Sequence, residues 1–266
     1  MAYLKGKTVL LTGGGKATLS DGSAGSIGYG IAIAFAKEGA NLVLTGRNMQ
    51  KLLDAKEELE QLYGIRVLPV QADISAGNDN GATASDVVRQ AVETFGGIDV
   101  LINNAQASAS GVPLASHTLA QFDLALYSGL YATFHYMQAA YPYLKESKGC
   151  VINFASGAGF FGHVGQCAYA AAKEGIRGLS RVAAAEWGPD GIRVNVICPL
   201  AMTESLQDWK EHFPELFEKT IQGIPLGHFA DPKDDIGRVA VFLASEDAHY
   251  VTGETITLQG GSGLRP

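Results

Sequence analysis

Short runs of Val, Ile and Leu alternate along the chain with longer stretches whose apolar residues recur at helical spacing. The short runs contain few polar residues, which is typical of parallel strands that helices cover on both faces. The alternation therefore predicts βαβ units and an α/β fold with a parallel sheet of about seven strands. The predicted strands are Thr8–Thr12, Asn41–Thr45, Arg66–Gln71, Val100–Asn103, Cys150–Ala155, Arg193–Cys198 and Thr255–Leu258.

The stretches between the strands have the length and spacing of covering helices. No Pro- or Ser-rich linker and no repeat divides the chain, so residues 1–266 are expected to form one domain. Residues 200–225 follow a strand and carry aromatics, mixed charge and two prolines, which predicts a mobile flap over a substrate. The predicted helices are Tyr29–Lys37, Met49–Tyr63, Ser85–Phe95, Leu119–Leu144, Ala168–Trp187, Glu204–Gln222 and Pro232–Ala244.

Composition narrows the classes of partner. The net charge of −7 argues against nucleic acid, and Cys150, Cys167 and Cys198 form no metal-ligand spacing, so no metal is expected. An odd number of separated cysteines fits a reducing compartment. The first residues lack the apolar core of a signal peptide, and no apolar run reaches the ~18 residues of a membrane span. We therefore expect a cytoplasmic protein that acts on a small molecule away from membranes.

Two glycine clusters lie between the first strand and the first helix. Thr12-Gly13-Gly14-Gly15 follows the strand, and Gly25-Ser26-Ile27-Gly28-Tyr29-Gly30 opens the helix. A glycine-rich turn in this place lets backbone N–H groups approach a pyrophosphate at the helix N-terminus. The alternative is a flexible loop, but the position between strand and helix favours a dinucleotide site.

A second pattern points to acid–base chemistry. Tyr169 and Lys173 are four residues apart on a predicted helix and share one face, and Ser156 lies thirteen residues before the tyrosine. A phenol has a pKa near ~10, and a neighbouring ammonium lowers it toward the range that a general acid or base requires. A serine hydroxyl at a strand end could hold a carbonyl oxygen against the phenol.

With these motifs the sequence resembles the short-chain dehydrogenase/reductase family over essentially its whole length. The resemblance implies a doubly wound Rossmann-type fold and hydride exchange between a nicotinamide and a carbonyl or alcohol carbon. It makes Ser156, Tyr169 and Lys173 the catalytic residues. Two features depart from the family's T-G-x-x-x-G-x-G turn: Ser26 replaces the middle glycine, and Lys16–Ala24 resembles an insertion. Such an insertion either covers the cofactor phosphates or lengthens a surface loop.

The resemblance also implies the cofactor. Gly46 and Arg47 end the second strand where an acidic residue would favour NAD, and an arginine suits the 2′-phosphate of NADP(H). A surface arginine without a ligand is the alternative. The implied cofactor-binding residues are Gly13, Ser26, Ile27, Gly28, Arg47, Asp73, Ile74, Asn104, Tyr169, Lys173 and Thr203.

Further departures surround the catalytic residues. Gln106 replaces the last glycine of N-N-A-G, and Leu200 replaces the glycine of Pro-Gly. Gly129 stands where many members have an asparagine whose role is to support a helix kink with a free carbonyl for a relay water. Because glycine also permits a kink, we hypothesise that the relay survives without the side chain.

These departures resemble a narrower group, the NADP-dependent bile-acid 12α-hydroxysteroid dehydrogenases of gut anaerobes. That resemblance implies reversible oxidation of a 12α-hydroxyl, and the family implies a homotetramer. The alternatives are reduction of another carbonyl, such as a 3-oxoacyl thioester or a xenobiotic ketone, and a non-catalytic NADP-binding scaffold. Enoyl reduction is disfavoured because residue 166 is Gln, where the enoyl pattern needs Tyr. The implied substrate residues are Gln106, Ser156, Leu200 and Met202.

Overall fold

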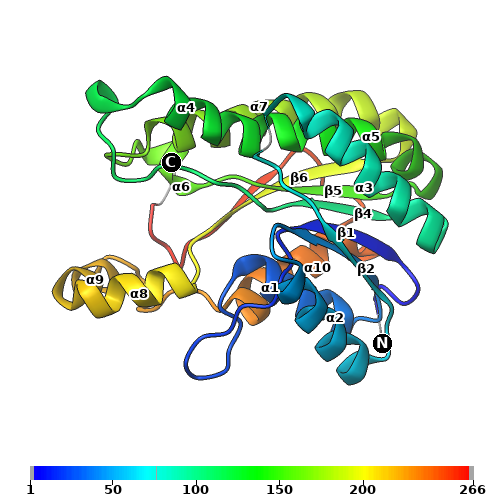
Figure 1. The fold of residues 1–266 in the computed structure, drawn as a ribbon, viewed down its shortest axis with the longest axis horizontal. Helices are drawn as coiled ribbons and strands as arrows, with labels where there is room; N and C mark the ends of the chain where they lie inside the picture. The colour runs from blue at the N-terminus through cyan, green and yellow to red at the C-terminus, as the bar shows by residue number, and fades with distance from the viewer. Residues whose placement is uncertain (1–2, 76, 264–266) are drawn as a thin grey trace.

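A parallel sheet runs through the centre of the molecule (Figure 1). The structure is a computed structural model and describes residues 3–75 and 77–263. Within these residues the sheet has seven strands in the order β3-β2-β1-β4-β5-β6-β7, and each lies within one residue of its predicted bounds. The strands are β1 (Thr8–Thr12), β2 (Asn41–Gly46), β3 (Val67–Gln71), β4 (Val100–Asn103), β5 (Cys150–Phe154), β6 (Arg193–Pro199) and β7 (Thr255–Leu258).

Helices cover both faces of the sheet, as the buried strands predict. Figure 1 shows α3, α4, α5 and α7 above the sheet and α1, α2 and α10 below it. The helices are α1 (Ile27–Lys37), α2 (Met49–Tyr63), α3 (Asn80–Phe95), α4 (Leu119–Ala125), α5 (Ala132–Ser147), α6 (Gly157–Phe161), α7 (Cys167–Trp187), α8 (Glu204–His212), α9 (Pro214–Gln222) and α10 (Arg238–Ala244). Short 3-10 turns are formed by Gly77–Asp79, Leu114–Ser116, Gly188–Asp190 and Glu246–Ala248.

The alternation of side chains along β1 divides the core into two halves. Val9 and Leu11 pack in the cluster that includes α1 and α10, whereas Leu10 packs in the cluster that includes α3 and α5. All three side chains are fully buried. A strand that points successive residues to opposite faces can be apolar throughout only when both faces are covered. The doubly wound, single-domain α/β fold is therefore confirmed.

The sheet order places the binding edge. β1 pairs with β2 on one side and with β4 on the other, so the order of strands reverses at β1. The loops after β1 and β4 leave the sheet side by side at this reversal. Such a switch point, at the carboxyl ends of parallel strands, is where ligands of open α/β sheets bind.

One predicted helix, Leu119–Leu144, is interrupted in the structure. α4 ends at Ala125, residues Leu126–Tyr131 form a turn of π-helix, and α5 begins at Ala132. We call Leu126–Tyr131 the π turn. Each π-helical turn contains one residue more than an α-helical turn, and such turns recur at functional sites. The apolar spacing predicted the helix but not the interruption.

Other helix ends also differ from the prediction. The predicted helix Glu204–Gln222 is two helices, because Pro214 lacks the amide hydrogen that would continue α8 and instead begins α9. The predicted helix Pro232–Ala244 starts with a second π-helical turn, Pro232–Gly237. α3 begins at Asn80, five residues before the predicted Ser85.

The insertion Lys16–Ala24 forms a compact antiparallel turn that reaches α8. Thr18 pairs with Ala24, and the Gln207 side-chain amide donates to the Ser20 hydroxyl at 2.9 Å. The Glu204 amide donates to the Gly25 carbonyl at 2.8 Å, directly after the insertion. The insertion is thus joined to the segment that the sequence predicted as a flap.

In the part of the chain that is described, every helix is too short or too polar to cross a membrane.

Candidate functional site

The site is built on a close contact between the ends of β1 and β4. The Thr12 hydroxyl accepts hydrogen bonds from the Asn104 amide at 3.0 Å and the Ala105 amide at 3.1 Å. The Asn104 side chain donates to the Thr12 carbonyl at 2.9 Å. These bonds align the two loops that leave the sheet at its switch point.

Glycine brings α1 against this junction. A Cβ on Gly28 would collide with the Gly13 carbonyl oxygen, and a Cβ on Gly13 would lie 3.0 Å from the Ala105 Cβ. Gly13 also has φ +77, a left-handed conformation that costs glycine little. Only residues without side chains at both positions let the N-terminus of α1 approach the loop after β1.

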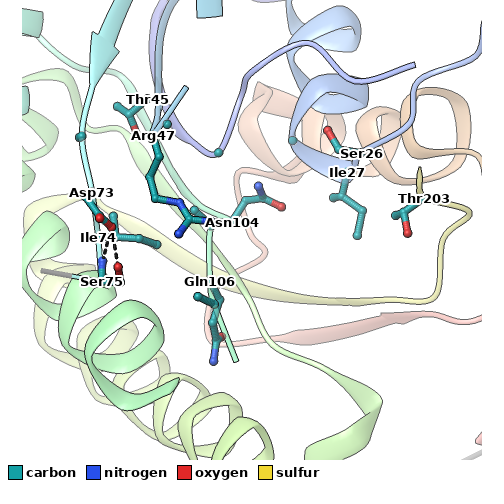
Figure 2. Close-up of a pocket in the computed structure, with 16 residues that line it drawn as sticks. Ser26, Ile27, Thr45, Arg47, Asp73, Ile74, Ser75, Asn104, Gln106 and Thr203 are labelled. Carbon is teal, nitrogen blue, oxygen red and sulfur yellow. Dashed lines mark hydrogen bonds between the residues drawn. The ribbon is translucent and has the colours of Figure 1, made fainter. Parts of the chain in front are cut away.

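A pocket of about 370 Å³ lies in front of this junction (Figure 2). It brings together nine residues that the sequence assigned to the cofactor: Gly13, Ser26, Ile27, Gly28, Arg47, Asp73, Ile74, Asn104 and Thr203. Lining residues that the sequence reasoning missed are Thr45, Gly46, Ala72, Ser75, Ala105 and Ala107. They adjoin the assigned positions at the strand ends, and that adjacency is the signal that could have found them.

Ser26 has a definite role at the start of α1. It is the N-cap residue, and its hydroxyl accepts a hydrogen bond from the Tyr29 amide at 3.2 Å. A capping serine satisfies one of the free amides of the first helical turn and leaves the others directed at the pocket. The serine that departs from the family's glycine therefore keeps a helix N-terminus suited to a pyrophosphate.

Arg47 extends from the end of β2 into the space between Ile74 and Asn104 (Figure 2). The Arg47 side chain is exposed, and its guanidinium forms no ion pair within the described residues. The pKa of Asp73 is lowered first by hydrogen bonds from Ser75 and further by the charge of Arg47. A cationic group thus lies at the pocket with a carboxylate, Asp73, near enough to feel its charge but with no ion-pair contact within the described residues.

Ser156, Tyr169 and Lys173 meet at the end of β5. Ser156 is the N-cap of α6, and its hydroxyl accepts from the Ala158 amide at 3.2 Å. Tyr169 and Lys173 occupy adjacent turns of α7, and the Lys173 Nζ lies 5.4 Å from the centre of the Tyr169 ring. The same Nζ donates to the Phe154 carbonyl at 2.7 Å. The three predicted catalytic residues are therefore brought together.

Comparisons with known proteins agree with this geometry. A family model described as enoyl-(acyl carrier protein) reductase matches residues 22–262. A 12α-hydroxysteroid dehydrogenase from a Clostridium species is 62% identical over all of both chains. A 3-oxoacyl-[acyl-carrier-protein] reductase from Thermotoga maritima is 32% identical over 93% of this chain and 97% of its own. A solved short-chain dehydrogenase/reductase structure from Burkholderia xenovorans has a TM-score of 0.88 at 30% identity and covers 99% of both chains.

The chain belongs to the short-chain dehydrogenase/reductase family. It is accordingly an oxidoreductase that uses a nicotinamide cofactor. The pocket fits such a group, because a Cβ-free cradle at Gly13 and Gly28, a capped helix N-terminus and the cationic Arg47 converge on it. Within the described residues no cluster of His, Cys, Asp or Glu could hold a metal ion.

The environment of the predicted catalytic residues of this oxidoreductase opposes charge. Burial lowers the pKa of Lys173 to about 7. Burial also raises the pKa of Tyr169, and the hydrogen bond from Ser156 only partly offsets the rise. The sequence predicted that Lys173 would lower the tyrosine pKa, yet in the chain alone the pKa is raised by burial, and the group that lowers it is the Ser156 hydroxyl. A phenolate here depends on further positive charge near the ring.

The predicted substrate residues separate into two groups. Gln106 lines the pocket, and Ser156 lies beside Tyr169. Leu200 and Met202 instead pack against a small cluster formed by Phe217, Ile224 and Phe229. The sequence could not tell whether Leu200 and Met202 line a substrate site or pack within the protein, because either role requires apolar residues after the sixth strand.

A buried chain of amides supports the catalytic helix and was not predicted. The Asn103 side chain donates to Asn153 at 2.8 Å, and Asn153 donates to the Ser180 hydroxyl at 2.8 Å. These bonds connect β4, β5 and α7 in the core. The Asn103 Oδ1 is buried without a hydrogen-bond partner within the described residues, so the network is satisfied at Asn153 and Ser180 but not at Asn103.

Lys173 should lower stability while it supports function. Its folded pKa of about 7 lies below the ordinary 10.5, so between these values the unfolded chain binds more protons. The penalty is complete at and below pH 7 and disappears as pH rises toward 10.5. Lys173→Met should therefore abolish turnover yet raise the unfolding free energy at pH 7 by roughly 1–3 kcal/mol, after the lost hydrogen bond is counted.

The measurement is urea unfolding of both proteins without cofactor between pH 6.5 and 10. The gain should shrink as pH rises. The exposed Lys5→Met serves as the control and should leave stability unchanged at every pH. A Lys173→Met protein less stable than the parent at pH 7 would contradict the argument.

Proposed function

We propose that this protein is an NADP-dependent 12α-hydroxysteroid dehydrogenase, which exchanges a hydride between the nicotinamide and the 12α-hydroxyl carbon of a bile acid. The observation that carries the substrate is the 62% identity, over the full length of both chains, to a relative of that name. The pocket and the catalytic group at the ends of β1, β4 and β5 support the reaction class.

The chain's own residues would act as follows. A nicotinamide cofactor held by the pocket would provide the hydride chemistry. Ser156 donates a hydrogen bond to the substrate oxygen and holds it beside the Tyr169 phenol, which transfers the proton. Lys173, fixed by the Phe154 carbonyl, provides positive charge next to the phenol ring when it is protonated. Lys173 is buried, and Ser156 and Tyr169 are half-buried, which limits water around the phenol.

Selection of NADP is assigned to Arg47. Its guanidinium reaches into the pocket beside Asn104 and has no ion-pair partner within the described residues. Arginine binds phosphate through two parallel charge-assisted hydrogen bonds, and a 2′-phosphate would offer such oxygens. Gly46 precedes it and leaves no acidic side chain at the end of β2 to bind a ribose hydroxyl.

Exposed apolar residues at the end of the molecule that carries α4, α6, α8 and α9 are suited to a flat steroid. Leu114, Phe161 and Phe213 are exposed, and they come from the loop before α4, from α6 and from the end of α8. α8 and α9 lie at the same end of the molecule as α4 and α6 (Figure 1). We assign residues 200–225 as a flap that covers the substrate. α8 contains no buried residue, as a segment that moves requires.

An acyl thioester is the second candidate substrate, since a relative 32% identical carries the name of a 3-oxoacyl reductase. Acyl carrier proteins are acidic, so their reductases need a basic surface near the cleft. Here α8 and α9 carry more acidic than basic residues. The balance of charge therefore favours the steroid.

We further propose that the protein forms a homotetramer and that it acts in the cytoplasm. An apolar groove on α5 and α7 is lined by Phe134, Val182 and Trp187, and the first two are exposed. An apolar face of this kind is suited to packing against a second copy across a two-fold axis. Cys150 and Cys167 form no disulfide within the described residues, which agrees with a reducing compartment.

The oligomer is tested by sedimentation. The parent protein should sediment as a tetramer, and Phe134→Glu should sediment as a smaller species because a charge in the groove must be desolvated. Tetramers of both proteins would place the interface elsewhere, and a parent monomer at micromolar concentration would exclude the assembly.

The substrate is tested by NADPH formation with bile acids that differ in hydroxyls at positions 3, 7 and 12. Turnover should require the 12α-hydroxyl. Trp209→Ala, in the proposed flap, should raise KM for the steroid by about 10-fold and leave KM for NADP unchanged, because Trp209 packs beneath α9 away from the cofactor pocket. Equal turnover of bile acids that lack a 12-hydroxyl would refute the steroid assignment, and turnover of 3-oxoacyl thioesters alone would favour the second candidate.

Arg47→Asp should reverse the cofactor preference. Loss of charge-assisted bonds to the 2′-phosphate is expected to lower kcat/KM with NADP by about 10- to 100-fold, while the carboxylate gains ribose contacts with NAD. Steady-state kinetics with both cofactors measure the ratio, and the exposed Lys5→Asp controls for net charge. A parent enzyme faster with NAD than with NADP would overturn the role of Arg47.

A further inference from the structure

The side chain of Gln106 occupies the space that Gly129 leaves empty. A Cβ built on Gly129 would lie 2.7 Å from both Cδ and Nε2 of Gln106 and 2.8 Å from its Oε1. No real Cβ comes so close to a carboxamide, so any side chain at residue 129 would displace the end of the Gln106 side chain from this space. These are two of the positions at which the sequence departs from its family.

Gln106 also binds the backbone where α4 passes into the π turn. Its Nε2 donates to the Ala125 carbonyl at 3.3 Å, the last residue before the turn. Its Oε1 is buried and has no hydrogen-bond partner within the described residues. The Gln106 carboxamide thus satisfies one backbone carbonyl of the helix with its Nε2 and leaves its Oε1 as an unused acceptor beside the turn.

Two further contacts hold the same turn. The Ser128 hydroxyl accepts from the Ala107 amide at 3.0 Å and donates to the Leu124 carbonyl at 2.6 Å. The Asn80 side chain donates to the Tyr127 carbonyl at 2.7 Å. The π turn is therefore held by the loop after β4 and by α3, which is why its wider geometry persists.

The π turn packs against the catalytic helix at the level of Lys173. A Cβ on Gly175 would lie 2.8 Å from the Leu130 Cδ2, so the turn and α7 touch without space between them. Gly175 is two residues beyond Lys173 on the same helix. A shift of the turn must therefore move α7 or open a void beside it.

We propose that Gln106 is a positioning residue for the reaction: its carboxamide, supplied by the loop after β4, takes the place of a carboxamide that the helix lacks at residue 129, and it sets the π turn against α7. The inference rests on the catalytic roles proposed above for Tyr169 and Lys173. Gln106 and Gly129 then form one unit, and each tolerates only a matching change in the other.

An exchange of the two side chains tests this unit. Gln106→Gly removes the carboxamide, and Gly129→Asn forces Gln106 from its site. Each single variant should lower kcat by about 10-fold or more, because small displacements of catalytic groups have effects of that size. The double variant, which carries the carboxamide from residue 129, should recover at least about 10-fold over Gly129→Asn. The exposed Gln61→Ala should retain the parent kcat.

Gln106→Glu separates positioning from simple filling of space. The carboxyl group has nearly the same volume but donates to the Ala125 carbonyl only when it is protonated. Its kcat relative to the parent should therefore fall as pH rises through the carboxyl pKa. A side chain that merely fills space would give a ratio independent of pH, and that result would overturn the proposal.

The other possible results of these experiments also support or refute the proposal. A Gln106→Gly variant with parental kcat and pH profile, or a double variant no better than the worse single, would refute the exchange. If the parent turns over no bile acid, the steroid assignment fails by itself. The exchange is then read from unfolding free energies of the four proteins: recovery in the double variant supports it, and additive losses refute it.

Discussion

The backbone contact between the loop after β1 and the start of α1 is the constraint on which the site depends. The Gly13 carbonyl lies where any side chain on Gly28 would be, and the Thr12 hydroxyl binds two amides of the loop after β4. This contact brings a helix N-terminus and two strand ends to one place. The pocket, and through Gln106 the catalytic helix, follow from it.

The proposed catalytic residues illustrate how a functional site can oppose stability. Lys173 is only 4% exposed and donates to one carbonyl, so its charge is poorly solvated. The same burial raises the pKa of Tyr169. Electrostatic interactions are larger where water is excluded. A positive charge added near the phenol should therefore lower the pKa of Tyr169 strongly.

Three departures from the family pattern are in contact with another part of the chain that accounts for them. Gln106 lies against Gly129, and the insertion Lys16–Ala24 lies against α8 through Ser20 and Gln207. In each pair one member would be unexplained by itself, since a glutamine in a glycine position or a long loop has no evident local purpose. The partner supplies the reason: a filled space in the first case and an attached helix in the second.

Local patterns along the chain were sufficient to predict the sheet, the covering helices and nine of the residues that line the pocket. Continuous apolar runs specify buried strands, and the carboxyl ends of parallel strands must converge, so residues such as Asp73 and Asn104 could be assigned to one edge. Tyr169 and Lys173 could be paired because helical spacing alone places them on one face. Each of these relations depends on neighbours in the chain.

The π turn, the packing of Leu200 and Met202 against the Phe217 cluster, and the contact of Gln106 with Gly129 follow instead from tertiary contacts. Apolar spacing is the same for an α-helix and for one interrupted by a single wider turn. The interruption is held by Asn80 and by the loop after β4, which are distant in sequence. The pKa of Tyr169 was likewise set by burial, a property of the packed molecule that no local pattern contains.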